Sequence, residues 1–220
     1  HTVGHHRYDG RSIDGDGKED RSHQCYDQQT GTNILMGSKG AYVVVDCEAD
    51  GPIPHDYSMV CFGAVVVTPE LDRTFYGEVR PISEKWDPRA LAISGISRET
   101  HETFDEPEDV MRAFKTWLDE TVEGRPIFIS DNNCFDWQWI NFYFHHFIGE
   151  NPFGYSGRRI GDLYSGMKMD PFVQWKHLRD TKHDHHPVND SKGNAEVLLK
   201  MREMGLKFPM NVKPLVNKIS

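Results

Sequence analysis

The sequence predicts an α/β fold in which helices pack on a mixed β-sheet. Continuous β-branched runs follow residue 40, apolar residues later recur at helical spacing, and the two patterns alternate toward the C-terminus. The 220 residues are enough for one such domain and marginal for two. No stretch approaches the roughly 20 apolar residues that span a membrane, and the N-terminus shows no secretory signal, so we expect no membrane association.

The first 38 residues differ from the rest of the chain. They are rich in Gly, Asp, His, Gln and Ser and show no hydrophobic period. We expect residues 1–38 to be a flexible arm, or an engineered leader ahead of a start at Met36, and residues 39–220 to be the folded domain. The histidines of this segment could bind a metal, although a solvated tail is the simpler interpretation: His1, His5, His6 and His23.

Three strands are expected first and should form a meander. AYVVVDC, from Ala41, is continuous and β-branched, as a buried strand requires. MVCFGAVVVT, Met59–Thr68, has the same character, and RTFYGEV, Arg73–Val79, alternates.

Helices and strands alternate in the rest of the chain. Asp105 can cap a helix whose first turn holds Pro107. Its apolar residues recur at helical spacing: Val110, Met111, Phe114, Trp117, Leu118 and Val122. The later elements are a strand at Pro126–Ser130, a helix at Phe135–Phe147, a short edge strand at Arg158–Leu163 and a helix at Asp190–Met204, which Gly205 ends.

Charge and cysteine usage limit the classes of function. The formal net charge of −9 argues against a broad phosphate-binding surface, because such surfaces are normally basic. A protein that meets phosphate through divalent cations can still be acidic. A local excess of basic residues precedes His183. These side chains could bind the phosphate backbone of a nucleic acid, or they could form a solvated face: Arg158, Arg159, Lys176, Arg179 and Lys182. The four cysteines form no CxxC pair, which favours reduced thiols and a cytoplasmic location.

Asp46 and Glu48 close the first strand. Residues two apart in a strand point to the same face, and paired carboxylates at the end of a buried strand are costly unless a cation neutralises them. Oxygen ligands favour Mg²⁺ or Mn²⁺ over zinc. Taken alone, Asp-x-Glu more often marks a solvated strand end.

Two further polar segments follow buried elements. In SDNNCFDWQW, residues 130–139, Asp136 would lie in the first turn of a helix, where the positive helix end favours a carboxylate. Asn132 could bind substrate or orient a ligand, or the segment could be only a polar turn and cap. In HHPVND, residues 185–190, Asp190 could be a helix cap or a metal ligand, and His185 could take a proton from water.

The combination of these segments, in this order, resembles the DEDDh branch of the DEDD 3′→5′ exonuclease superfamily, over roughly Ala41–Leu206. FGAV, residues 62–65, SGISRET, residues 94–100, and HHPVNDSKGNAEVLL, from His185, look like further motifs of that superfamily. The resemblance implies a ribonuclease H-like fold with a mixed five-stranded sheet flanked by helices. It also places the chain near oligoribonuclease, ribonuclease T and small stand-alone exoribonucleases from phages and bacteria.

The resemblance implies a complete site. Its metal ligands would be the four carboxylates, which would hold two Mg²⁺ or Mn²⁺ ions: Asp46, Glu48, Asp136 and Asp190. His185 would be the general base, with His186 as the second choice because its spacing differs. Substrate contacts would come from Asn132 and from aromatic rings that could stack on the terminal base: Phe62, Phe135 and Trp137. Cys47, Asp131 and Ser94 stand where many relatives have Thr, His and His, which affects how the terminal nucleotide is held.

The expected function is metal-dependent 3′→5′ exonuclease action on a single-stranded RNA or DNA 3′ end, with release of nucleoside 5′-monophosphates. Similarity to the small exoribonucleases favours RNA. The alternatives are a DNA 3′→5′ exonuclease and a catalytically inactive module that only binds nucleic acid. Relatives are often dimers, so a homodimer is a further expectation.

Overall fold

A computed structural model describes residues 24–27, 32–35 and 39–214, with side chains from Lys39 onward. The chain divides into two units, His1–Ser38 and Lys39–Ser220. In the first unit, β1 (Gln24–Asp27) pairs antiparallel with β2 (Thr32–Leu35). The four N-terminal histidines and Met36 lie outside the described residues, so the expectation of a flexible arm or leader stays a prediction.

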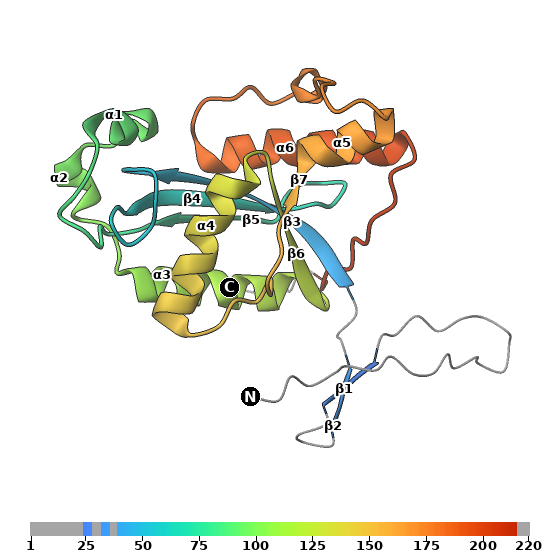
Figure 1. The fold of residues 1–220 in the computed structure, drawn as a ribbon, viewed down its shortest axis with the longest axis horizontal. Helices are drawn as coiled ribbons and strands as arrows, with labels where there is room; N and C mark the ends of the chain where they lie inside the picture. The colour runs from blue at the N-terminus through green and yellow to red at the C-terminus, as the bar shows by residue number, and fades with distance from the viewer. Residues whose placement is uncertain (1–23, 28–31, 36–38, 215–220) are drawn as a thin grey trace, which may run out of the picture. The chain divides into compact units, whose positions relative to one another are not determined.

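The second unit is built on a mixed five-stranded sheet with the order β5-β4-β3-β6-β7 (Figure 1). β3 (Lys39–Ala49), β4 (Met59–Val66) and β5 (Thr74–Glu78) form the predicted antiparallel meander. β6 (Arg125–Ser130) pairs parallel with β3, and β7 (Arg158–Arg159) pairs parallel with β6. The predicted fold class is therefore confirmed.

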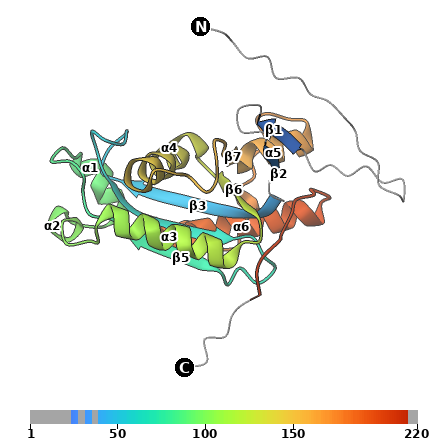
Figure 2. The same cartoon turned by 90° about the horizontal axis from the view of Figure 1, so that it is seen from below.

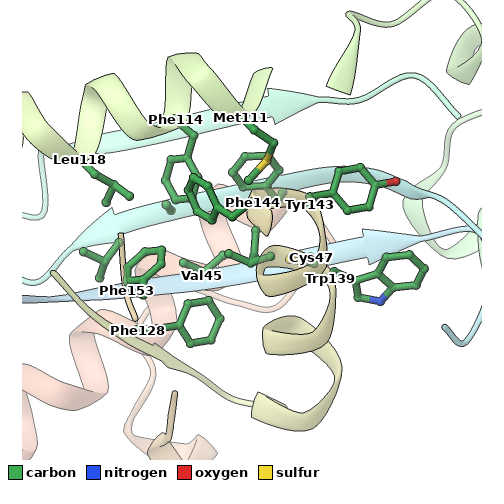
Figure 3. Close-up of a cluster of buried hydrophobic side chains, with 14 of the residues drawn as sticks. Val45, Cys47, Met111, Phe114, Leu118, Phe128, Trp139, Tyr143, Phe144 and Phe153 are labelled. Atoms are coloured by element: carbon green, nitrogen blue, oxygen red, sulfur yellow. The ribbon is translucent and has the colours of Figure 1, made fainter. Parts of the chain in front are cut away.

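Side chains of β3 alternate between two hydrophobic cores. Odd-numbered residues such as Val43 and Val45 pack with α3 (Pro107–Thr121) and α4 (Asn133–Tyr143). The core on this face is aromatic, and its rings fill the space between sheet and helices (Figure 3). The residues labelled in that view are Val45, Cys47, Met111, Phe114, Leu118, Phe128, Trp139, Tyr143, Phe144 and Phe153.

The opposite face of the sheet carries the even-numbered residues of β3. Tyr42 and Val44 pack there with α5 (Ile160–Lys168) and α6 (Pro187–Glu203). Helices thus cover both faces (Figure 2). No described helix is both long enough and apolar enough to cross a membrane. Among the described side chains, Cys47, Cys61 and Cys134 are free thiols.

Two local predictions were wrong. Arg158–Leu163 is a strand only at its first two residues, and α5 begins at Ile160, because Ile160 and Tyr164 are buried one helical turn apart. Asp105 does not cap α3: Glu106 occupies that position, without a side-chain bond, and the Asp105 carbonyl accepts a bond from the amide of Arg80. α4 is followed by a π-helical turn, Phe144–Ile148, within the predicted helix.

An arm of short helices, not expected from the sequence, joins β5 to α3. It contains α1 (Pro88–Leu91), the 3-10 turn Ala92–Ser94 and α2 (Arg98–His101). A buried ion pair of 3.0 Å between Arg98 Nη1 and Asp50 Oδ2 holds these short helices against the end of β3. Arg98 Nη2 also donates to the Ser83 carbonyl at 2.9 Å.

Candidate active site

The site begins where β3 leaves the hydrophobic core. Asp46 and Glu48 continue the row of Tyr42 and Val44, so both carboxylates lie on the α6 face of the sheet. Both side chains are partly buried, whereas Cys47 between them points into the opposite core. The pairing of β3 with β4 shifts register after Glu48, so the regular strand ends with these carboxylates.

α4 brings Asp136 to the same place. β6 lies parallel to β3, so the carboxyl ends of both strands meet at one edge, and α4 starts just beyond β6. Asp136 is buried in the first turn, and its Oδ1 accepts a 3.1 Å bond from the Cys47 amide. Its Oδ2 is buried with no hydrogen-bond partner, which leaves one carboxylate oxygen free for a ligand.

α6 contributes Asp190 from its first turn. The helix begins at Pro187 with His186 in the cap position, so Asp190 is not the cap. Instead its oxygens accept bonds from the backbone amides of Asp184, at 3.3 Å, and His185, at 3.2 Å. The carboxylate is buried, and the positive end of α6 favours its charge.

α6 can reach the sheet because β4 carries a glycine opposite Asp46. Gly63 is the antiparallel partner of Asp46, and a Cβ there would lie 2.4 Å from the Pro187 carbonyl carbon. The Ser191 hydroxyl donates to the Gly63 carbonyl at 3.1 Å. The helix terminus therefore packs directly on the strand backbone.

The carboxylates perturb one another. Burial raises the pKa of Asp46 well above its usual value, and the charges of Asp136, Asp190 and Glu48 raise it further. Burial, followed by the charge of Asp190, raises the pKa of Glu48 to about 7. Burial likewise raises the pKa of Asp136 to about 7, although two donors, the Ser130 hydroxyl and the Cys47 amide, oppose the shift. The four predicted acids thus form one cluster whose joint ionisation requires nearby positive charge.

Two histidines face this cluster. The ring of His185 lies with Nδ1 3.6 Å from Glu48 Oε1, and His183 Nδ1 lies 2.7 Å from Asp190 Oδ2. The two rings meet edge to face at 4.3 Å. His185 has a left-handed backbone, with φ +60°, a conformation that non-glycine residues adopt rarely and that histidine tolerates better than most. His186 stacks on Tyr76 instead, at 5.1 Å.

These residues fit divalent cations. The set is dominated by carboxylate oxygens, which Mg²⁺ and Mn²⁺ prefer, and the unpartnered Asp136 Oδ2 is a donor atom without another use. A different set also exists, because atoms of His183, His185 and Asp190 that could bind a metal lie within 4.8 Å of one another. Both sets share Asp190.

The predicted substrate contacts divide into two groups. Phe62 is fully buried and packs on Phe75 and Phe114, so its ring has no face for a base, and that prediction was wrong. Phe135 and Trp137 are partly buried at the start of α4. Asn132 is exposed at the cap position of that helix and makes no side-chain capping bond, so its amide is available.

Sequence reasoning missed the role of Asp184 in the turn before α6. Its carboxylate accepts bonds from the His186 amide, at 3.0 Å, and from Asn189 Nδ2, at 2.8 Å. These bonds hold the turn in which His185 takes its left-handed backbone. The sequence signal was the position of Asp184 two residues before His186, because an aspartate that accepts a bond from the amide two residues later forms an Asx turn.

The mixed sheet with carboxylates gathered at the end of its first long strand is the arrangement expected of a metal-dependent hydrolase. Comparison with known proteins gives the same class: residues 43–169 match the RNase_T family, described as exonuclease. The chain belongs to this family, in the DEDDh 3′→5′ exonuclease superfamily with its ribonuclease H-like fold. It is thus a 3′→5′ exonuclease, and the inactive-module alternative is set aside.

One curated relative is the 3′-5′ DNA exonuclease Cap18 of Escherichia coli. It is 35% identical over 176 residues, which cover 74% of this chain and 92% of the relative. The nuclease domain of 3′hExo, a DEDDh family member solved with bound rAMP, has a TM-score of 0.62 at 16% identity, covering 79% of this chain and 96% of that one.

A second solved structure is a zinc-bound complex of Escherichia coli exonuclease I with single-stranded DNA. It has a TM-score of 0.60 at 16% identity and covers 76% of this chain, which spans only 42% of exonuclease I. At these identities the likeness shows the fold.

Proposed function

We propose that this protein is a two-metal-dependent exonuclease that removes nucleoside 5′-monophosphates from single-stranded DNA 3′ ends. The observation that carries the proposal is the convergence of four acids from three elements, in which the pKa values of Asp46, Glu48 and Asp136 are raised. The four acids are Asp46, Glu48, Asp136 and Asp190. DNA is favoured over RNA because the 35% identical relative is named a DNA exonuclease, whereas the sequence motifs favoured RNA.

The roles follow from position. The four carboxylates would hold two Mg²⁺ or Mn²⁺ ions, which supply positive charge to the attacking and leaving oxygens. His185 lies beside Glu48 and accepts the proton of the attacking water. A bond forms from the water oxygen to phosphorus, and the bond from phosphorus to the 3′ oxygen breaks. The departing strand keeps that oxygen, which takes a proton from solvent to become a 3′ hydroxyl, and His185 returns its proton to solvent.

Three residues are proposed to hold the terminal nucleotide. Asn132 presents an exposed amide next to Asp136, and Phe135 and Trp137 flank that carboxylate at the start of α4. An amide can bond to a base or sugar, and a partly exposed ring can stack on a base.

The test is digestion of matched DNA and RNA oligonucleotides, labelled at the 5′ end, with Mn²⁺ or Mg²⁺. We expect stepwise shortening of DNA, no activity in EDTA, and no activity in Asp190→Asn. Preferential shortening of RNA would overturn the substrate assignment. Full activity of Asp190→Asn would overturn the site.

A pair of histidine variants separates the two metal sets. We expect His185→Asn to lower kcat by about 10²- to 10⁴-fold, as loss of a general base does. We expect His183→Asn to retain most activity and the same Mn²⁺ dependence. If His183→Asn instead requires much more Mn²⁺ for activity, the histidine-containing set binds the ion. If His185→Asn does not lower kcat, His185 is not the general base.

A further inference from the structure

The stretch that begins with β7 and ends at Lys182 has a charge opposite to that of the whole protein. Residues 158–182 contain six Lys or Arg and three Asp, whereas the complete chain has a net charge of −9. This segment includes β7, α5 and the 3-10 helix Lys176–Leu178. Figure 1 shows it leading to the N-terminal end of α6, where the site lies.

Two large apolar side chains stand out at the far end of this segment. Met169 is 90% exposed and Phe172 is 85% exposed, directly after α5. The turn that carries them is held by hydrogen bonds: the Asp170 amide donates to the Ser165 carbonyl at 3.1 Å, and the Phe172 amide to Asp170 Oδ1 at 2.9 Å. The same hydrogen-bonded turn therefore presents two large apolar side chains to solvent, where a ligand could contact them.

A chain of contacts joins this turn to the active site. Lys168 Nζ lies 5.4 Å from the ring centroid of Tyr164, which meets His177 edge to face at 6.4 Å. The neighbouring Lys176 forms a 2.7 Å ion pair with Asp131, the residue before Asn132. Cations and rings therefore alternate from the turn to the start of α4.

Lys168 is available for a partner. Among the described residues, no carboxylate lies within salt-bridge distance of its ammonium group. Lys168 and the exposed ring of Phe172 are four residues apart in the sequence, at the end of α5 and in the turn after it. An exposed cation and an exposed ring on one turn match a single nucleic-acid strand, which offers phosphates and unstacked bases together. An acidic protein partner would match the cation but would not require stacking rings.

We propose that the surface formed by Lys168, Phe172, His177 and Lys176 binds the nucleic-acid strand upstream of the 3′ end, with Lys168 on a phosphate and Phe172 stacked on a base. This inference rests on the proposed exonuclease function. The surface raises affinity for strands long enough to reach Phe172 and leaves the chemistry at the carboxylates unchanged.

The experiment compares a long single strand with a minimal substrate, the p-nitrophenyl ester of thymidine 5′-monophosphate, which is too short to reach α5. Phe172→Ala should lower kcat/KM for the long strand by about 5- to 100-fold, the range of one base–aromatic stack. Activity on the ester should stay at the wild-type level. Tyr155→Ala is the matched control, because that ring is 92% exposed and stacks on His145 beyond α4.

Salt dependence tests the cation. Lys168→Ala should reduce the slope of log kcat/KM against log salt by about 0.7 for the single strand, and Lys207→Ala, an exposed lysine after α6, should not. Equal losses on both substrates would overturn the inference and indicate a structural effect. Unchanged kinetics on the long strand would also overturn the inference, and would favour a protein as the partner of this surface. A wild-type protein inactive on both substrates would instead refute the proposed function.

Discussion

Replacing Gly63 by alanine should push the start of α6 away from the sheet and remove most of the enzyme's activity. The added Cβ would lie 2.4 Å from both the Pro187 carbonyl carbon and the Val188 nitrogen, against at least 3.4 Å for an ordinary contact. Both obstacles are backbone atoms, so no side chain can rotate away. The start of α6 must move by the difference, about 1 Å.

That displacement acts on catalysis through Asp190, which lies one turn into α6. A misplacement of about 1 Å in an active site can reduce the rate about 10²-fold. Overpacking of a close contact costs about 1 to 3 kcal/mol of folding free energy. We therefore expect Gly63→Ala to fold, to melt at a lower temperature and to lose about 99% of its activity.

The assay is hydrolysis of the p-nitrophenyl ester of thymidine 5′-monophosphate with Mn²⁺, alongside thermal unfolding followed by circular dichroism. Gly166→Ala is the matched control, since no atom lies within 4 Å of a Cβ added there. In mid-helix it should gain about 0.5 to 1 kcal/mol and keep full activity. Wild-type activity and melting temperature in Gly63→Ala would refute the reasoning.

Other predictions concern charge. The folded-state pKa values of Glu48 and Asp136, raised by burial to about 7 from 4.5 and 3.8, mean that the folded state binds extra protons. In EDTA, the stability that these two groups contribute should be greatest below about pH 4 and be lost as the pH rises through 7, by about 3 to 4 kcal/mol for each group. Mn²⁺ should flatten this decline, and a pH-independent melting temperature in EDTA would contradict it. Arg98→Ala should cost about 3 to 5 kcal/mol in urea unfolding because it leaves Asp50 buried and unpaired. The exposed Arg112→Ala should cost under about 1 kcal/mol, and equal losses in the two variants would refute the importance of the buried pair.

Local patterns were sufficient for the strands that form the site. The run before Asp46 could only be a buried strand, and the two-residue period of a strand places Glu48 on the same face. Local patterns failed at Arg158–Leu163, where only the first two residues form a strand and a helix begins at the third. The competing signal, burial of Ile160 and Tyr164 one turn apart, depends on the core that α6 provides.

Aromatic residues show the same limit. Phe62 is the cross-strand partner of Cys47, and Trp137 follows Asp136 in the sequence. Phe62 nevertheless lies inside the α3 core, whereas Trp137 is partly exposed. A sequence gives the alternation of a strand but not which side of it another element covers. The order of the strands and the packing of the helices decide that.

The sequence by itself determined the class of fold, because side-chain periodicity is a local property, and the order of its motifs predicted the four acids and the histidine beside them. Only the tertiary structure decided that the acids share one cluster, that Asp190 accepts backbone bonds and is not a helix cap, and that Gly63 lets α6 approach Asp46. The physical reason is that burial and charge coupling depend on distances between segments, and those distances are fixed only when the sheet and helices pack.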